Sequence, residues 1–450
     1  MKKLLLSALV SSLVLSLAAA EYAMKFTTDK KSAIYRCNEN ITMTAQLLLD
    51  GKAAVGCKAE VTLFKNGKAV QSEKFIVSEK PFTVTTKLEQ PGWTHIYCKF
   101  ADANGKTLKH KIKWRGKVTN APLNGGIGAM AEPEKITSPL PEPEDFDAFW
   151  DKVKKEALAH PMDVLEKIDI TPEKLKDKFT VYDMKISCAG GKPVSGYLVI
   201  PKNAVPKSLP LHVSYHGAGF RSATMQLSAA QRGMITFDVN AHGIPNGKSK
   251  EFYESVRKET NRICGGRYNH SNKDNRDKYF YHSVYMRVLR SLQYVKSLPE
   301  WDGKNLVVVG GSQGGAQALI ACALDHDVTL TRASVPALSD HGGSIAGRQS
   351  GWPRVYEAVD GKYDPAVAKT MSYYDNVFFA RRIKCPIYIC TGFIDTVCSP
   401  TSVYAVYNNI PAGTFKSMCI TPTAAHTASD RYFSKALDKC MKAIKKGNGK

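Results

Sequence analysis

The stretch Asn305-Leu-Val-Val-Val-Gly-Gly-Ser-Gln-Gly-Gly315 decides the fold prediction for this chain. Residues 306–309 form an unbroken apolar run, which is typical of a buried strand in a parallel sheet, and Ala316 begins a helix-like run. The glycines around Ser312 allow a sharp strand–turn–helix in which the serine backbone is strained and its hydroxyl stands above the sheet. The sequence therefore predicts Ser312 as a nucleophile at the start of a helix.

Two simpler interpretations of this segment are a Gly-rich phosphate loop and a plain turn. A phosphate loop would carry a lysine directly after its glycines, and this segment has none. The pattern G-x-S-x-G is weak evidence when it stands alone, so the prediction depends on the strand before it and the helix after it.

Strand-like and helix-like runs alternate on both sides of this segment. The helix-like runs include residues 279–297 and 316–324. The strand-like runs are residues 179–186, 194–200, 211–215, 234–238, 305–309, 386–390 and 417–420. This alternation predicts an α/β fold of the α/β-hydrolase type, a mostly parallel sheet flanked by helices. The polar segment 244–276 is expected to be a long loop that is either functional, such as a lid, or mobile.

A serine nucleophile needs a general base, and the base needs an orienting carboxylate. In this type of sheet the chain order is serine, then acid, then histidine. His426 is the only histidine after His341, and it follows a predicted strand. Asp395 follows another strand, at the carboxyl end where the functional groups of parallel sheets gather. We therefore predict Ser312, Asp395 and His426 as a catalytic triad.

Acyl transfer also requires N–H donors for the oxyanion. We expect the backbone N–H of Gln313 to be one donor and that of Ala218, in Tyr215-His-Gly-Ala-Gly219, to be the other. His216 in that loop is expected to be structural rather than a second base. The other acidic candidates are expected to be helix caps or solvated charges: Asp360, Asp364 and Asp375.

The amino-terminal part of the chain has a different pattern. Residues 21–120 contain short alternating runs at 41–49, 59–64 and 94–100, separated by turn dipeptides such as Asn66-Gly67. We expect a small all-β domain here, an immunoglobulin-like sandwich. Residues 121–143 are rich in Gly and Pro and are expected to be a linker. The catalytic domain is placed at residues 144–450. It would begin with a helix whose apolar face is formed by Phe146, Phe149, Trp150, Val153 and Ala157.

Residues 1–20 have the pattern of a signal peptide. Lys2 and Lys3 precede an apolar run that ends in Ala18-Ala-Ala20 and is too short to span a bilayer. The sequence therefore predicts cleavage near Ala20 and export, either secretion or a periplasmic location. The alternative is an uncleaved membrane anchor.

The net charge of the chain indicates which partners it could bind, and its cysteine pattern indicates whether it could bind a structural metal. The formal net charge is +22, which favours polyanionic partners. The chain has no nucleic-acid-binding motif, so an acidic polysaccharide is the candidate, and a lysine-rich solvated surface is the alternative. The chain has eleven cysteines but no C-x-x-C pair, so we expect no structural zinc. Cys57 and Cys98 are the candidate disulfide.

From about Pro139 onward the chain resembles the acetyl xylan esterase / cephalosporin C deacetylase family. The motifs that carry the resemblance are Phe146-Asp-Ala-Phe-Trp150, Gly310-Gly-Ser-Gln-Gly-Gly315, Ser372-Tyr-Tyr-Asp-Asn376, Lys384-Cys-Pro386 and Gly392-Phe-Ile-Asp-Thr-Val-Cys398. The resemblance implies an α/β-hydrolase that removes acetyl groups from short xylo-oligosaccharides and similar esters, without a metal or other cofactor. It implies Ser312, Asp395 and His426 as the triad, and a homo-oligomer, because family members often form rings.

Two positions depart from the family pattern. The family has Arg-Gly-Gln-Gly where this chain has Asn240-Ala-His-Gly243, and Glu where this chain has Thr427. Because an Arg and a Glu there could pair, we expect Asn240 and Thr427 to lie close together and to support the His426 loop. The departures leave open another α/β-hydrolase, such as a serine peptidase or a dienelactone hydrolase-like enzyme. A non-catalytic polysaccharide-binding protein is the second alternative, and the retention of all three triad residues argues against it.

Overall fold

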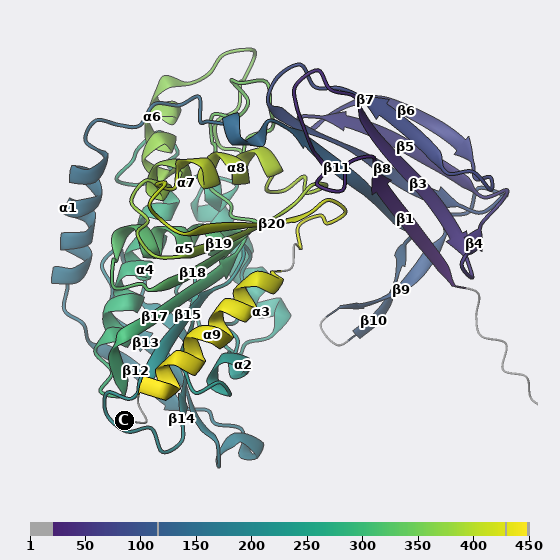
Figure 1. The fold of residues 1–450 in the computed structure, drawn as a ribbon. Coiled ribbons are helices and arrows are strands. Elements are labelled where there is room, and N and C mark those ends of the chain that lie inside the picture. Colours follow the sequence, from purple (N-terminus) through teal and green to yellow (C-terminus); the bar gives the residue numbers. More distant parts are fainter. Residues whose placement is uncertain (1–20, 115–116, 428–429, 448–450) are drawn as a thin grey trace, which may run out of the picture.

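The computed structural model describes residues 21–114, 117–427 and 430–447, so the predicted signal peptide at 1–20 lies outside the described residues. The chain forms an all-β domain and an α/β domain (Figure 1). Among the helices of the described ranges, none is both long and apolar enough to cross a membrane.

The α/β domain is built on a nine-stranded sheet with the order β12-β13-β14-β16-β15-β17-β18-β19-β20. Its strands are β12 (Val164–Asp169), β13 (Phe179–Ile186), β14 (Val194–Pro201), β15 (Leu209–Tyr215), β16 (Ile235–Asn240), β17 (Trp301–Gly311), β18 (Leu330–Ser334), β19 (Ile387–Gly392) and β20 (Lys416–Thr421). The strands from β16 to β20 are parallel, and those from β12 to β16 pair antiparallel. This mixed sheet agrees with the predicted α/β-hydrolase fold.

Both faces of this sheet are covered, as the unbroken apolar run of β17 requires. Leu306 and Val308 join the core that contains α5, whereas Val307 and Val309 pack with residues of α9 on the opposite face. The helices are α1 (Phe146–Ala159), α2 (Leu227–Ala230), α3 (Lys250–Ile263), α4 (Phe280–Lys296), α5 (Gln313–Leu324), α6 (Pro365–Tyr374), α7 (Asn376–Ala380), α8 (Pro400–Asn409) and α9 (Arg431–Gly447), with 3-10 turns η1 (Pro133–Lys135), η2 (Glu173–Leu175) and η3 (Tyr268–His270). Helix α1 buries the apolar face predicted from its sequence.

The segment 244–276, expected to be a loop, contains α3. This helix was missed because its sequence is mostly polar and it buries only Tyr253, so its few apolar residues did not stand out. Local interactions support it instead: Ser249 caps its amino terminus, and Glu259 pairs with Arg262 one turn later. Strands β12 and β18 were also missing from the predicted set.

The all-β domain consists of two main sheets that share one apolar core, to which residues of β3, β5 and β8 contribute. One sheet contains β1 (Tyr22–Thr28), β3 (Ile41–Leu49), β4 (Lys52–Ala53) and β7 (Phe82–Thr86). The other has the order β2 (Ile34–Tyr35), β11 (Asn124–Ala131), β8 (Gly92–Ala101), β5 (Lys58–Lys65) and β6 (Lys68–Ile76). A separate hairpin, β9 (Lys109–Trp114) and β10 (Lys117–Pro122), projects from the domain (Figure 1). The turn residues Asn66 and Gly67 have positive φ, as predicted for a hairpin.

Two predictions for this region are wrong. Residues 124–131 are not linker: they form β11, which pairs along its whole length with β8. Cys57 and Cys98 form no disulfide. Val61, not Cys57, lies opposite Cys98, so the two cysteines are about 13 Å apart along the sheet at 3.3 Å per residue. That separation is far beyond the reach of a disulfide.

The all-β domain lies at the carboxyl ends of the parallel strands of the large sheet, beside the ends of β19 and β20 (Figure 1). The N–H of Gly128 in β11 donates to the carbonyl of Pro422, just beyond β20, at 2.9 Å. The two domains therefore meet at the edge where the predicted site residues lie.

Candidate active site

Ser312 occupies the turn between β17 and α5, with φ 57° and ψ −123°. The turn is tight enough to require its glycines: a Cβ atom at Gly310 would clash with the carbonyl of Gly314, and one at Gly314 with the carbonyl of Tyr215. The N–H of Ser312 donates to the carbonyl of Ser334 in β18 at 2.9 Å. A positive φ at a serine is strained, and here neighbouring strands hold it in place.

The predicted acid and base form a hydrogen-bonded pair. His426 Nδ1 and Asp395 Oδ2 are 2.8 Å apart, although the residues are distant in sequence. The other oxygen, Asp395 Oδ1, accepts the N–H groups of Val397 and Cys398 at 2.7 and 3.0 Å. The Asp395 side chain is fully buried, whereas that of His426 is 29% exposed. The carboxylate is thus fixed in one orientation, and the imidazole reaches the surface.

Ser312 and His426 line one open cavity of about 660 Å³. The buried Cys398 thiol contacts the Ser312 side chain, and burial raises the pKa of this thiol well above its ordinary value. Cys398 therefore stays a neutral neighbour of the serine. The fold brings the three predicted triad residues together, with the serine and the histidine facing the same space.

The two predicted oxyanion donors also lie at this cavity. Gln313 is the first residue of α5, so its N–H has no acceptor within the helix. Ala218 lines the cavity, and a Cβ atom at the preceding Gly217 would lie 3.5 Å from Ser312 Cβ. The Gln313 side chain is buried, and its Oε1 accepts from the Tyr281 hydroxyl at 2.9 Å, which anchors the start of α5.

His216 is structural in its contacts, as expected. Its Nε2 accepts the N–H of Ala241 at 3.2 Å, and its Nδ1 lies 2.7 Å from the carbonyl of Gly217, to which it donates as the neutral tautomer. Burial lowers the pKa of His216. With both ring nitrogens occupied by backbone groups, this histidine positions the Ala218 loop.

The other acidic candidates cap helices or lie in turns. Asp364 caps α6 and Asp375 caps α7. Asp360 lies in a turn with φ 50°. Asp375 is nevertheless fully buried rather than solvated, because it also accepts the N–H groups of Asp340 and His341. Burial raises the pKa of Asp375 to about 6.

The expected pairing of Asn240 with Thr427 is wrong. Asn240 is fully buried, and its side-chain amide donates to the carbonyl of Arg221 at 2.9 Å and to Asn246 Oδ1 at 3.2 Å. Thr427 is exposed, and its N–H donates to the carbonyl of Ala425. Asn240 therefore supports the loop around Arg221 instead of the His426 loop.

The cavity is lined by further residues that the sequence did not reveal, because they come from separate strands and loops. Arg221 and Arg332 bring positive charge to it, and Trp352 and Val397 bring apolar surface. Nε of Arg332 is buried, with no hydrogen-bond partner among the described residues. In the described ranges, no group of three or more His, Cys, Asp or Glu side chains is placed to hold a metal ion.

The comparisons with known proteins bear on this site. The family described as acetyl xylan esterase (AXE1) matches residues 132–443. The chain belongs to the acetyl xylan esterase family. It is similar to acetyl esterase Axe7A of Xylanibacter ruminicola, with 36% identity over 310 residues, which are 68% of each protein. This membership makes the chain a carboxylic ester hydrolase acting on acetylated carbohydrate, and it disfavours a peptidase, a dienelactone hydrolase and a non-catalytic binding protein.

Two solved structures share the fold of the catalytic domain. Acetyl xylan esterase from Paenibacillus sp. R4 has 25% identity and a TM-score of 0.56, covering 69% of this chain and 98% of that one. Acetyl xylan esterase 1 from Thermoanaerobacterium sp. JW/SL YS485 has 21% identity and a TM-score of 0.54, covering 70% of this chain and 98% of that one. Nearly all of each relative is matched by the α/β part of this family member. Its all-β domain, which ends where the family match begins, is additional.

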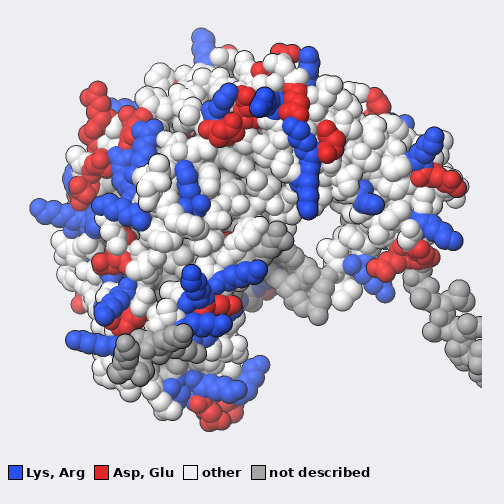
Figure 2. Space-filling model, in the orientation of Figure 1, with Lys and Arg blue, Asp and Glu red and all other residues white. Residues whose placement is uncertain are grey.

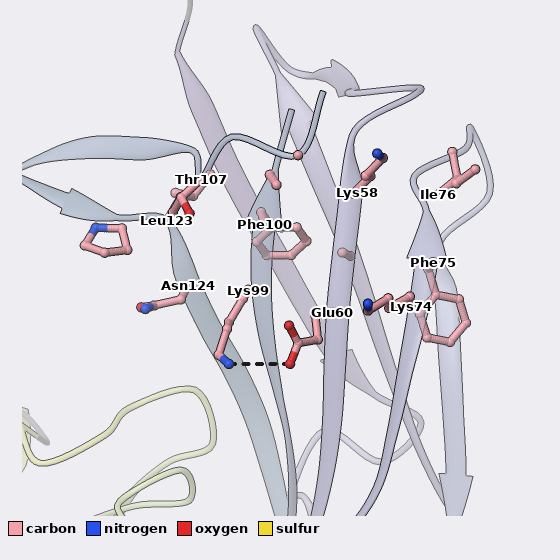
Figure 3. A pocket seen from close by; sticks show the side chains of 14 residues that line it. Lys58, Glu60, Lys74, Phe75, Ile76, Lys99, Phe100, Thr107, Leu123 and Asn124 are labelled. Carbon is pink, nitrogen blue, oxygen red and sulfur yellow. Dashed lines mark hydrogen bonds and ion pairs between the residues drawn. The ribbon is translucent and has the colours of Figure 1, made fainter. Parts of the chain in front are cut away.

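A second cavity, of about 720 Å³, lies on the all-β domain, and Ser312 is not among the residues that line it. It is a groove on the five-stranded sheet in which Lys58, Lys74 and Lys99 surround Glu60, with Ile76 at one edge (Figure 3). Lys99 Nζ and Glu60 Oε1 are 3.5 Å apart, so one of the three ammonium groups is paired.

Proposed function

We propose that this esterase removes acetyl groups from acetylated oligo- or polysaccharides outside the cytoplasm, through an acyl-enzyme on Ser312. The observation that carries the proposal is the strained Ser312 at the helix start, sharing a cavity with a histidine that is hydrogen-bonded to a buried aspartate. Export rests on the signal-peptide pattern of residues 1–20.

The proposed reaction assigns one role to each residue. Ser312 Oγ attacks the acetyl carbonyl while His426 Nε2 takes its proton, and Asp395 stabilises the imidazolium that forms. The backbone N–H groups of Gln313 and Ala218 donate to the oxyanion. The tetrahedral intermediate collapses, and the sugar oxygen leaves with the proton from His426. Water, deprotonated by His426, then attacks the acetyl-serine ester and releases acetate and free Ser312.

We further propose that the acyl group rests against Trp352 and Val397, two apolar residues that line the cavity. The expected substrate preference is for acetyl over longer acyl groups. Initial rates on p-nitrophenyl acetate, butyrate and octanoate test this directly. We expect kcat/KM to fall from acetate to octanoate by about tenfold or more, since a misfit of one or a few methylenes costs on the order of 1–3 kcal/mol. Equal rates on butyrate and octanoate would contradict the proposal.

The sugar is proposed to be acidic. Two features support this: Arg221 and Arg332 line the cavity, and the groove of Figure 3 presents three lysines around one glutamate. On the face drawn in Figure 2, Lys and Arg are spread over both domains with Asp and Glu between them. The specific contacts of the two cavities, rather than one large basic patch, therefore support the proposal.

For the all-β domain we propose an immunoglobulin-like sandwich, supported by its two sheets of short strands packed on one core. A homo-oligomer also remains a proposal, which rests on the family resemblance.

A further inference from the structure

Two side chains on the outward-facing row of strand β8 are buried, although an isolated all-β domain would expose them to solvent. Side chains alternate along a strand, and Ile96, Cys98 and Phe100 face the core of the all-β domain. Trp93 and His95 lie in the opposite row, together with the exposed Lys99, yet both are completely buried. The catalytic domain covers them.

The covering segment is the acid loop, residues 392–398, which carries Asp395. The indole N–H of Trp93 donates to the carbonyl of Phe393, two residues before Asp395, at 2.5 Å. Trp93 itself cannot move freely, because it stacks on His95 with ring centroids 4.6 Å apart, and His95 stacks on Phe64 at the same distance. A rigid column of three rings thus ends on one peptide group of the acid loop.

The same peptide group holds the histidine loop, residues 421–427. Its N–H, which is that of Ile394, donates to the carbonyl of Ala424 at 3.1 Å. The N–H of the preceding peptide group, that of Phe393, donates to the carbonyl of Thr421 at 3.2 Å. From the other side, Gly128 of β11 donates to Pro422 at 2.9 Å. A Cβ atom at Gly128 would clash with the carbonyl of Phe393, so the strand and the acid loop are in direct backbone contact.

A third contact comes from the turn of the β5–β6 hairpin. The carbonyl of Asn66 accepts the N–H of Gln349, whose side chain donates to the carbonyl of Thr396, the residue after Asp395, at 2.9 Å for both bonds. Asn66 Oδ1 also accepts the N–H of Trp93 at 2.9 Å. The all-β domain therefore contacts the acid loop directly before Asp395, at Phe393, and indirectly after it, through Gln349 of the catalytic domain.

We infer that the all-β domain is part of the catalytic unit, with Trp93 as a positioning residue that fixes the acid and histidine loops through the carbonyl of Phe393. The inference rests on the proposed roles of Asp395 and His426, and it goes beyond them by giving a catalytic purpose to a domain that lies outside the family match. Because a misplacement of about 1 Å can cost on the order of 10²-fold in rate, loosening this contact should slow the chemistry rather than weaken substrate binding.

The test is Trp93→Phe in the full chain, with Trp150→Phe as a matched control. Trp150 is equally buried and also donates its indole N–H to a backbone carbonyl, that of Tyr373, at 3.0 Å, but on α1 and not on the acid loop. With p-nitrophenyl acetate, Trp93→Phe should lower kcat by about 10- to 100-fold with KM changed by less than about twofold. The rate at which a serine-directed phosphonate labels Ser312 should fall in parallel. Trp150→Phe should lower the melting temperature comparably but leave kcat within about twofold.

A second pair of variants leaves Trp93 intact. Gly128→Ala should push against the backbone of Phe393 and lower kcat. Gly125→Ala, in the same strand, meets only side-chain atoms, those of Met24 and Phe26 at 3.2 Å, and should not lower kcat. If Trp93→Phe fails to fold, the comparison of these two glycine variants tests the inference in its place. Equal effects of the two tryptophan changes, or a rise in KM at constant kcat, would overturn the inference. An active Ser312→Ala variant would instead overturn the proposed function, so the two failures are distinguishable.

Discussion

At the scale of single residues, the main feature of the site is that hydrogen bonds hold its side chains and backbone in fixed orientations. Two backbone N–H groups hold one oxygen of Asp395, which leaves the other oxygen for His426. Ser312 is held in a strained conformation by hydrogen bonds to a neighbouring strand. Groups fixed before the substrate arrives need no reorganisation during the reaction, which is the main source of electrostatic catalysis.

The first prediction concerns the nucleophile. Ser312→Ala should lose on the order of 10⁴-fold or more in kcat while keeping its melting temperature, because it removes the attacking oxygen and little packing. Steady-state rates on p-nitrophenyl acetate measure the loss. Peptide mass spectrometry of the wild-type enzyme after treatment with a serine-directed phosphonate should place the adduct on Ser312. An adduct on another serine would refute the assignment.

At the scale of elements, the strand–turn–helix between β17 and α5 works only because three segments meet closely there. Gly310 and Gly314 let β17, α5 and the end of β15 approach to backbone contact, and β18 completes the turn through Ser334. The glycines thus have a packing role in addition to their conformational freedom.

The second prediction tests that packing role. Gly314→Ala places a methyl group against the carbonyl of Tyr215, so we expect a destabilisation of about 3 kcal/mol or more together with loss of activity. Gly413→Ala is the control, since a Cβ atom there meets nothing within 4 Å and should change the free energy of unfolding by less than about 0.5 kcal/mol. Chemical denaturation measures both. If the Gly314→Ala protein were as stable as the control, the backbone of the strand–turn–helix at Ser312 would be able to shift and accommodate the added methyl group.

At the scale of the whole molecule, the all-β domain extends the interior of the protein over groups that would otherwise be solvated. Burial lowers the pKa of His95, in the stack under the acid loop, to about 3. Within the catalytic domain itself, burial lowers the pKa of His212 in β15 to about 4. A protonated imidazole at either position would be desolvated, so each histidine stays neutral in the folded protein.

The third prediction follows from these two pKa values. Because the unfolded histidines titrate near pH 6.5, the unfolded state binds more protons below that pH. The stability that they contribute is fully present above pH 6.5 and is lost as the pH falls from 6.5 toward 4. Each histidine should contribute a slope of about 1.4 kcal/mol per pH unit in the middle of this range. His95→Phe, which can keep the stack, should flatten the dependence by about that amount in denaturation measured from pH 4.5 to 7.5. An unchanged slope would show that His95 is protonated in the fold.

The fourth prediction concerns charge over the whole surface. KM for a glucuronate-bearing acetylated oligosaccharide should rise with added salt, because exposed charges are screened beyond about 8 Å at physiological ionic strength. Lys58→Glu with Lys74→Glu should raise this KM further at low salt. The control, Lys152→Glu with Lys155→Glu on α1, changes the net charge equally but lies outside the groove. A KM that is independent of salt, or equal effects of the two pairs, would count against acidic substrate binding in the groove.

The sequence alone determined those parts of the protein that depend on short stretches of chain. The strand–turn–helix at Ser312 was predictable because an apolar strand, glycines and a helix follow one another within a few residues. Asp395 and His426 were predictable because chain order and strand ends place them at one edge of the sheet. The apolar face of α1 followed from its periodicity in the same way.

Only the tertiary structure decided what depends on distant backbone. The glycines of residues 124–131 resemble a linker in sequence, but Gly126 and Gly128 are needed because β8 and the acid loop lie against them. Asn240 donates a hydrogen bond to the carbonyl of Arg221, and Trp93 donates one to the carbonyl of Phe393, which is 300 residues away in the sequence. A glycine has the same local signature whether it gives flexibility or admits a neighbour, and that neighbour is specified by packing of the whole chain.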